Sequence, residues 1–284
     1  MGEDANGSGR RPKTLILDVY GRYSPQFHGW LAVSNLVHLM GLLGVDEQAV
    51  RSALSRMSRR GLLHKEVRDG VRGYATTAAA DDLLADGDRR IYASMDAAPL
   101  SEGWVLVSFS IPEAERDKRH LLRSKLMWLG MGNVGSALWI APRRSLDLVT
   151  ESVATLGLTD LVDVFTAQYQ GFDEATELVR RAWDLEALEG QYQQFLDDHG
   201  PLEERLARRR RPVDGAEAFG WYTLALHDWR KFPYLDPGLP AELLARNWPG
   251  RRAADLFGRL RARLEPTAFS YAASLVGDTR HVRS

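Results

Sequence analysis

The sequence predicts a multidomain α+β protein, and three features of its 284 residues support this fold class. Near the N-terminus, apolar residues recur at helical spacing and are followed by two short β-type segments around Asp69-Gly70. In the middle of the chain, runs of strand-forming residues alternate with helical periodicity, and after Asp173 helical periodicity dominates. We therefore predict a disordered tail at 1–13, a first domain at 14–95, a ferredoxin-like middle domain at 100–172 and a helical domain at 173–284.

Composition excludes several classes of protein. The chain has no cysteine, so it can form no disulfide, thiolate nucleophile or zinc–thiolate site. No apolar run approaches the roughly 18 residues that a membrane-spanning helix needs. The segment Met1–Lys13 lacks the apolar core of a signal peptide. We expect a cytoplasmic protein without a membrane anchor, a metal or a cofactor.

Charge is distributed unevenly along the chain. The formal net charge of the whole protein is −1. Residues 10–76 nevertheless contain eleven arginines and lysines against five acidic residues, a net charge of +6. A basic N-terminal segment on an acidic remainder is typical of a nucleic-acid-reading domain joined to a part with another task.

Helical spacing predicts three helices in this basic segment. Ile16, Val19, Tyr20 and Tyr23 fall on one face of a helix at Thr14–Tyr23. A second apolar stripe comprises Val33, Leu36, Val37, Met40 and Leu43. The third helix spans Asp46–Arg60 with Asp46 as its N-cap, and its inward residues are Val50, Ala53, Leu54 and Met57.

The outward face of the third helix and the segment after it carry the candidate DNA-binding residues. Asp69-Gly70 between Leu62–Arg68 and Val71–Thr76 indicates a type I′ hairpin. A helix pair followed by such a hairpin predicts a winged helix-turn-helix, with the helix in the major groove and the hairpin along phosphates. The candidates hold hydrogen-bonding or cationic side chains and no carboxylate: Gln48, Arg51, Ser52, Ser55, Arg56 and Arg59 on the helix, and Lys65, Arg68 and Arg72 on the hairpin. A merely solvated helix face is the alternative interpretation.

The middle segment predicts a small α/β sandwich. Strands are expected at Trp104–Ser110, Ser136–Ala141 and Leu161–Ala167, with helices from Pro112 to Leu129 and at Ser145–Leu156. This order favours a ferredoxin-like fold with one strand unassigned. Residues 130–135 have the G-x-G-x-x-G spacing of a dinucleotide site. We reject that interpretation because a helix precedes these glycines and a strand follows, the reverse of the order that the site requires.

The last third of the chain is predicted to be helical. Leu178, Ala182, Leu185, Leu188, Tyr192 and Phe195 suit one long amphipathic helix. Further helices are expected at Gly215–Trp229, Ala241–Arg246 and Ala253–Leu264. An arginine cluster before Pro212 fits either a solvated helix end or a phosphate contact, and its members are Arg205, Arg208, Arg209, Arg210 and Arg211.

Several blocks resemble the PaaX-type transcriptional repressors, which regulate phenylacetic acid catabolism. They are HDWRKFPYLDPGLPAELL at 227–244, NWPG at 247–250, VRSALSRM at 50–57 and LWIAP at 138–142. Ala245 departs from the pattern, which often has proline there. The resemblance implies a homodimer that represses from a palindromic operator on double-stranded DNA. It also implies a middle domain similar to a small CRISPR nuclease subunit, and an aryl-acyl-CoA such as phenylacetyl-CoA as the effector.

Two other functions compete with the repressor as interpretations of the sequence. A metal-dependent nuclease would need carboxylates at a strand end, but the first middle strand ends in Phe109-Ser110-Ile111-Pro112, so we predict no catalytic residues. A dimeric scaffold without DNA affinity is the third possibility. For the effector, the sequence offers an aromatic and cationic group that could stack a ring and hold phosphates: Trp229, Arg230, Lys231 and Tyr234. The alternative is that Trp229 is core and the cations lie on the surface.

Overall fold

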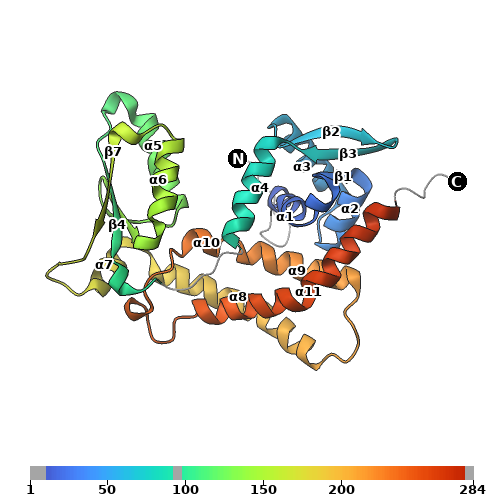
Figure 1. Cartoon of the computed structure of the whole chain (residues 1–284). Coiled ribbons are helices and arrows are strands. Elements are labelled where there is room, and N and C mark those ends of the chain that lie inside the picture. The colour runs from blue at the N-terminus through green and yellow to red at the C-terminus, as the bar shows by residue number, and fades with distance from the viewer. Residues whose placement is uncertain (1–10, 92–97, 279–284) are drawn as a thin grey trace. The chain divides into compact units, whose positions relative to one another are not determined.

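A computed structural model describes residues 11–91 and 98–278 (Figure 1). The described part of the chain is an α+β structure, as predicted, and it contains two antiparallel sheets. The principal elements are α1 (Pro12–Tyr23), β1 (Trp30–Ala32), α2 (Val33–Leu42), α3 (Glu47–Arg59), β2 (Leu63–Arg68), β3 (Val71–Thr76), α4 (Ala78–Ile91), β4 (Trp104–Phe109), α5 (Arg116–Trp128), β5 (Gly132–Gly135), β6 (Leu138–Pro142), α6 (Leu146–Thr155), β7 (Val162–Ala167), α7 (Ala175–Ala182), α8 (Leu185–Arg208), α9 (Gly215–Trp229), α10 (Phe232–Leu235) and α11 (Gly250–Asp278).

The chain forms two compact units, and each combines segments that are distant in the sequence. Among the described residues, the first unit contains 11–91, 199–230 and 255–278, and the second contains 98–198 and 231–254. Residues 173–284 therefore contribute to both units. The predicted domain boundaries stay a prediction, and the one at 95 lies outside the described residues. The predicted tail also lies outside them up to residue 10, but Pro12 and Lys13 belong to α1, because proline is well suited to the first turn of a helix.

In the first unit, α1 lies in the hydrophobic core. Ile16, Val19, Tyr20 and Tyr23 are all buried, as the spacing predicted. Helix α1 contacts α2, α3, α4 and α9. The Tyr20 hydroxyl donates a hydrogen bond to the Tyr74 carbonyl oxygen in β3, 2.9 Å away, and burial raises the pKa of Tyr20 above its usual value. The first helix thus fixes the helices and the hairpin around it.

Polar contacts over long sequence distances fasten α1 to the C-terminal helices of the same unit. Asp18 accepts a hydrogen bond from Arg230, the residue that follows α9, and its other carboxylate oxygen lies 2.6 Å from Nδ1 of His227 in α9. Arg22 donates to Glu265 of α11 at 2.8 Å. Burial opposes ionisation of Glu265, but hydrogen bonds and the charges of Arg22 and Arg261 outweigh it and lower its pKa. None of these pairings was evident from sequence spacing.

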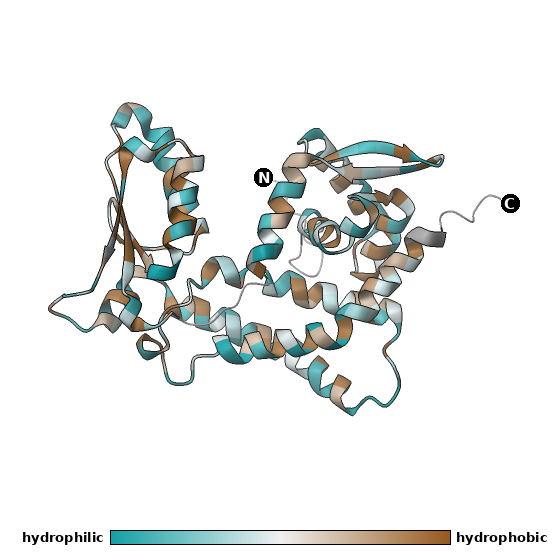
Figure 2. Cartoon of the chain, in the orientation of Figure 1, coloured by the Kyte–Doolittle hydropathy of each residue, from teal (hydrophilic) through white to brown (hydrophobic). Residues whose placement is uncertain are grey.

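The second unit is built on a four-stranded antiparallel sheet in the order β5-β6-β4-β7. The segments predicted as strands correspond to β4, β6 and β7, and β5 is the strand that the sequence left unassigned. Two hydrophobic clusters share the sheet residues; one includes Leu122 and Leu126 of α5, and the other includes Leu178 and Val179 of α7. Figure 2 shows hydrophobic residues along the strands, and both hydrophobic and hydrophilic residues along α5 and α6.

The glycine motif at 130–135 follows α5 and runs into β5, in agreement with our rejection of a dinucleotide site. Gly130 has a positive φ of 74°. A Cβ atom on Gly132 would lie 2.7 Å from the Trp183 ring, so the position has no room for a side chain. These glycines serve a turn and a close packing contact.

The prediction of one long helix through Leu178 and Phe195 was wrong. Helix α7 ends at Ala182, Trp183 is extended with φ −128° and ψ 146°, and α8 begins at Leu185. The Trp183 indole nitrogen donates to the Gly130 carbonyl oxygen at 2.8 Å, and its ring packs against Gly132. Asp184 then accepts a hydrogen bond from the Ala187 amide at 3.0 Å and starts the next helix. A tertiary contact of tryptophan therefore overrides local helical periodicity.

Two predicted C-terminal helices also differ. At 241–246 only a single 3-10 turn forms, at Ala241–Leu243, and Leu244 is already extended. Helix α11 runs from Gly250 to Asp278 rather than over 253–264, and it contains Pro266. Buried residues continue at four-residue spacing on both sides of this proline, at Leu260, Leu264, Ala268 and Ala272. Packing of this stripe compensates for the hydrogen bond that proline removes. No helix in the described part of the chain is long and apolar enough to span a bilayer.

Candidate nucleic-acid interface

Helix α3 is held by its cap and by its inward face. The Asp46 carboxylate accepts a hydrogen bond from the Ala49 amide at 2.9 Å, as the sequence predicted for an N-cap. Gly44, with φ +79°, makes the turn between α2 and α3. All four residues predicted to face inward are buried: Val50, Ala53, Leu54 and Met57. Helix α3 packs against α1 and α2, which leaves its opposite face to solvent.

The outward face of α3 is exposed at every predicted position. The exposed residues are Gln48, Arg51, Ser52, Ser55, Arg56 and Arg59. Arg51 pairs with Glu47 one turn earlier at 2.7 Å, and both side chains are 58% exposed. The exposed face therefore includes one carboxylate, Glu47, although the predicted set of outward residues contained none. Such an exposed pair is weak enough for Arg51 to exchange partners.

Arg56 and Arg59 differ from Arg51 because no carboxylate in the described part of the chain pairs with them. Within residues 11–91 and 98–278, neither side chain has a hydrogen-bond or ion-pair partner. Ser52 lies one helical turn before Arg56, and Ser55 lies beside it in the sequence. The exposed face thus presents two unpaired guanidinium groups and two hydroxyl groups, which can donate to bases or phosphates.

The hairpin after α3 forms as predicted. Asp69 and Gly70 have φ values of 51° and 78°, the two positive values that a type I′ turn requires. Arg68 opposes Val71, and the strands remain in register to the Leu63–Thr76 pair. Lys65 and Arg72 are exposed and, in the described part of the chain, unpaired. Leu62 donates its amide to the Met57 carbonyl oxygen at 3.1 Å, so α3 and the hairpin are directly joined.

Arg68 lies in a different environment from the other hairpin cations. Its guanidinium pairs with Glu66 at 2.7 Å, donates to the Phe27 carbonyl oxygen at 3.1 Å and lies 5.3 Å from the Trp30 ring centroid. The hydrogen bond from Arg68 lowers the pKa of Glu66. A phosphate contact by Arg68 therefore competes with three intramolecular contacts. Its role in DNA binding stays a prediction, and it is weaker than those of Lys65 and Arg72.

Strand β1 completes the sheet of the first unit and was missed by the sequence analysis. Its three residues pair with β3 in the order β1-β3-β2. Trp30 approaches β3 so closely that a Cβ atom on Gly73 would lie 2.4 Å from its ring. A three-residue strand has too few positions to show alternation, but Gly73 inside a predicted strand was a usable sign of close approach.

The four candidate effector residues are divided between the two units. Trp229 is buried and stacks on Phe257 at 4.9 Å, and Arg230 pairs with Asp18. Both belong to the first unit. Lys231 and Tyr234 belong to the second unit, where Lys231 lies 5.2 Å from the Phe232 ring centroid. Tyr234 packs beside Trp128 with ring centroids 5.1 Å apart. The alternative interpretation holds for Trp229, which is core, while Arg230 forms a largely buried ion pair instead of lying free on the surface.

No group of three or more histidine and acidic side chains in the described segments is arranged to hold a metal ion. The described site is instead a polar and cationic surface made by α3 and the β2–β3 hairpin, carried on α1 and α2. We call this surface the α3–hairpin face, and its residues are Gln48, Arg51, Ser52, Ser55, Arg56, Arg59, Lys65 and Arg72.

A solved structure shares this architecture. An uncharacterized protein from Mycobacterium tuberculosis matches with a TM-score of 0.58 and 20% identity over 92% of this chain and 98% of the other. At this identity the likeness concerns the fold.

Sequence comparison identifies the family. Residues 11–79 match the PaaX-like protein family, residues 97–179 the PaaX protein central Cas2-like domain, and residues 183–274 the PaaX-like protein C-terminal domain. The transcriptional repressor PaaX of Escherichia coli (strain K12) is 27% identical over 264 residues, which are 91% of this chain and 82% of that protein. The chain belongs to the PaaX family.

Proposed function

We propose that the protein is a ligand-responsive transcriptional repressor that binds a palindromic operator as a homodimer. The observation that carries this proposal is the α3–hairpin face, where Arg56 and Arg59 are exposed and unpaired among the described residues and a basic hairpin follows directly. The relative in Escherichia coli is a transcriptional repressor, which supports the same function. In this proposal an aryl-acyl-CoA such as phenylacetyl-CoA releases the operator.

The element order supports a winged helix-turn-helix for the first part of the chain. Helices α2 and α3 are joined by a short glycine-containing turn and followed by the β2–β3 hairpin. The second unit has the order β4-α5-β5-β6-α6-β7, which supports a ferredoxin-like interpretation of the middle domain. In this arrangement α3 enters the major groove and the hairpin follows the phosphate backbone.

Different roles follow for the two groups of cations. Arg56 and Arg51 lie on the exposed helix face, where a guanidinium can make two hydrogen bonds to guanine O6 and N7. Ser52 and Ser55 add hydroxyl groups between them. Lys65 and Arg72 on the hairpin are positioned for phosphates, which carry no sequence information. Specificity is therefore assigned to α3, and general affinity to the hairpin.

This assignment predicts different results for two arginine variants. Arg56→Ala should weaken binding to the specific operator by about 1–3 kcal/mol, the usual value of a good base contact, and should weaken binding to a random duplex much less. Arg72→Ala should weaken binding to both duplexes by the same factor and reduce the slope of log K against log salt by about one. Fluorescence anisotropy titrations of the full-length variants over a salt series measure both quantities.

Arg263→Ala provides a matched control, because Arg263 is exposed on α11, outside the α3–hairpin face. Its affinity for either duplex should stay within about a factor of two of the parent. Equal losses on operator and random duplex for Arg56→Ala would remove the base-reading role of this residue. An affinity unchanged by either Arg56→Ala or Arg72→Ala would contradict the proposed interface as a whole.

The homodimer and the effector require their own measurement. Light scattering should give twice the chain mass of 31.9 kDa for the free protein. Because an effector shifts an equilibrium only through different affinities for two states, phenylacetyl-CoA should lower operator affinity at a concentration where coenzyme A alone does not. A monomeric mass at all working concentrations would contradict the dimer, and equal effects of phenylacetyl-CoA and coenzyme A would contradict the aryl-acyl effector.

A further inference from the structure

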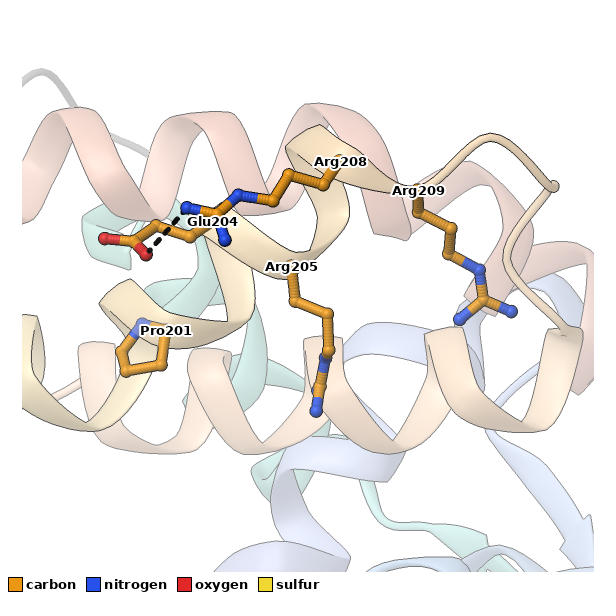
Figure 3. Close-up of a pocket in the computed structure, with 5 residues that line it drawn as sticks. All are labelled: Pro201, Glu204, Arg205, Arg208 and Arg209. Carbon is orange, nitrogen blue, oxygen red and sulfur yellow. Dashed lines mark ion pairs between the residues drawn. The ribbon is translucent and has the colours of Figure 1, made fainter.

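The C-terminal end of α8 carries an arginine pocket that the DNA interface does not use. It has a volume of about 540 Å³ and is lined by Pro201, Glu204, Arg205, Arg208 and Arg209 (Figure 3). This volume lies within the range of small-molecule sites. All five lining residues and the neighbouring helix α9 belong to the first unit. Arg210 and Arg211 follow directly and are exposed.

Helix α9 orients two of the three lining arginines. The guanidinium of Arg205 lies 4.8 Å from the ring centroid of Trp221, and that of Arg209 lies 5.9 Å from the same centroid. Arg209 also donates to Glu217 at 2.8 Å. In Figure 3 the side chains of Arg205 and Arg209 both extend toward the neighbouring helix. Stacking on an aromatic face restricts a guanidinium, so less entropy is lost when it binds a ligand.

The carboxylates near the pocket leave positive charge uncompensated. Glu217 forms an ion pair with Arg209 at 2.8 Å. Glu204 lies 3.9 Å from Arg208, with the side chains 70% and 84% exposed, and such a pair holds its arginine weakly. Within the described residues Arg205 has no carboxylate partner. Arg205 and Arg208 can therefore both turn their donors to a ligand.

We infer that this pocket binds the phosphoryl groups of a ligand. Planar guanidinium groups present paired N–H donors that match phosphoryl oxygens, and two of them in one pocket neutralise the charge of a diphosphate. The simplest competing explanation is that arginines in the last turn of α8 offset the helix dipole. That explanation predicts cations at the helix end, but it requires neither a pocket nor stacking on Trp221. The inference goes beyond the DNA interface and does not depend on α3.

Isothermal titration calorimetry of the full chain with inorganic pyrophosphate and with ADP tests this site. The variant Arg205→Gln with Arg208→Gln should weaken binding of both probes at least tenfold. Its matched control is Arg180→Gln with Arg181→Gln, which removes the same charge from exposed last-turn arginines of α7. The control should change affinity less than twofold, because Arg180 and Arg181 belong to the second unit and are not among the residues that line this pocket.

A duplex titration of the same variants distinguishes a free ligand from the DNA backbone as the source of phosphate. If the Arg205→Gln, Arg208→Gln variant loses pyrophosphate and ADP binding but binds duplex DNA as tightly as the control variant does, a free ligand is supported. A tenfold loss of duplex affinity beyond the control supports DNA phosphates at this pocket. The inference would be overturned if the two double variants behaved alike in all titrations. It would also be overturned if the parent protein bound neither probe and the Arg205→Gln, Arg208→Gln variant kept the parent's duplex affinity. Arg56→Ala should leave pyrophosphate binding unchanged, so failure of the α3 assignment is seen separately.

Discussion

Asp18→Ala is expected to lower the free energy of unfolding by about 3 kcal/mol, because it breaks a buried ion pair and leaves its partners behind. Asp18 is buried in α1 with its side chain only 4% exposed. It contacts Arg230 through Oδ1, and Nδ1 of His227 lies 2.6 Å from its other oxygen. Without the carboxylate, a guanidinium and an imidazole lose their acceptor in a region that water reaches poorly.

The expected magnitude lies at the lower end of the range for such a loss. Removal of one partner from a buried pair lowers stability by about 3–5 kcal/mol. The side chain of Arg230 is 31% exposed and can regain some hydration, whereas that of His227 is 15% exposed. Asp18→Asn should have a smaller effect, because an amide keeps one acceptor oxygen for Arg230, although it loses the charge and the second acceptor.

Urea unfolding of the full chain, followed by circular dichroism, measures these differences. Glu47→Ala is the control in the same unit, since its pair with Arg51 is 58% exposed on both sides and should contribute about 0.5 kcal/mol. In the double variant Asp18→Ala with Arg230→Ala, the free energy of unfolding should fall by less than the sum of the decreases in the two single variants. If Asp18→Ala were no less stable than Glu47→Ala, the ion pair would not hold α1 to α9.

The parts of the fold that follow from short-range chemistry were predictable. The N-cap Asp46, the inward stripe from Val50 to Met57 and the Asp69-Gly70 turn are each decided by residues within a few positions. The helix Gly215–Trp229 is likewise bounded at Asp214, whose side chain caps it. The exposed face of α3 was predictable for the same reason, because burying one stripe of a helix exposes the other.

The tertiary arrangement was not predictable in this way. Asp18 and His227 are separated by 209 positions in the sequence, and no local pattern links them. The assignment of α9 and α11 residues to the same unit as α1 depends on such pairs. Within the candidate site, the same limit applies to Arg68: its spacing on the hairpin suggested a phosphate contact, but Phe27 and Trp30 already engage its guanidinium.

Aromatic residues caused the clearest local failure. The sequence around Leu178–Phe195 has continuous helical periodicity, and Trp183 is compatible with a helix. The structure instead extends the backbone at Trp183 because its ring fits beside two glycines of the β5 region. Gly132 offers the space and Gly130 the acceptor. Only a pattern that links Gly130 to a tryptophan 53 residues later would have predicted this break.

Trp183→Ala should therefore lower the free energy of unfolding by about 3 kcal/mol, near the bottom of the usual range for removal of a packed tryptophan, because Trp183 is only partly buried. The variant loses the ring contact with Trp104, whose centroid is 6.3 Å away, and the hydrogen bond to Gly130. Trp183→Phe keeps a ring but has no hydrogen-bond donor, and it should lower the free energy of unfolding by about 1–2 kcal/mol.

Phe172→Ala is the control, since Phe172 is fully exposed and its removal should change stability by less than about 0.5 kcal/mol. Chemical unfolding of the three variants decides the matter: equal stability of Trp183→Ala and Phe172→Ala would mean that the break between α7 and α8 does not depend on the tryptophan.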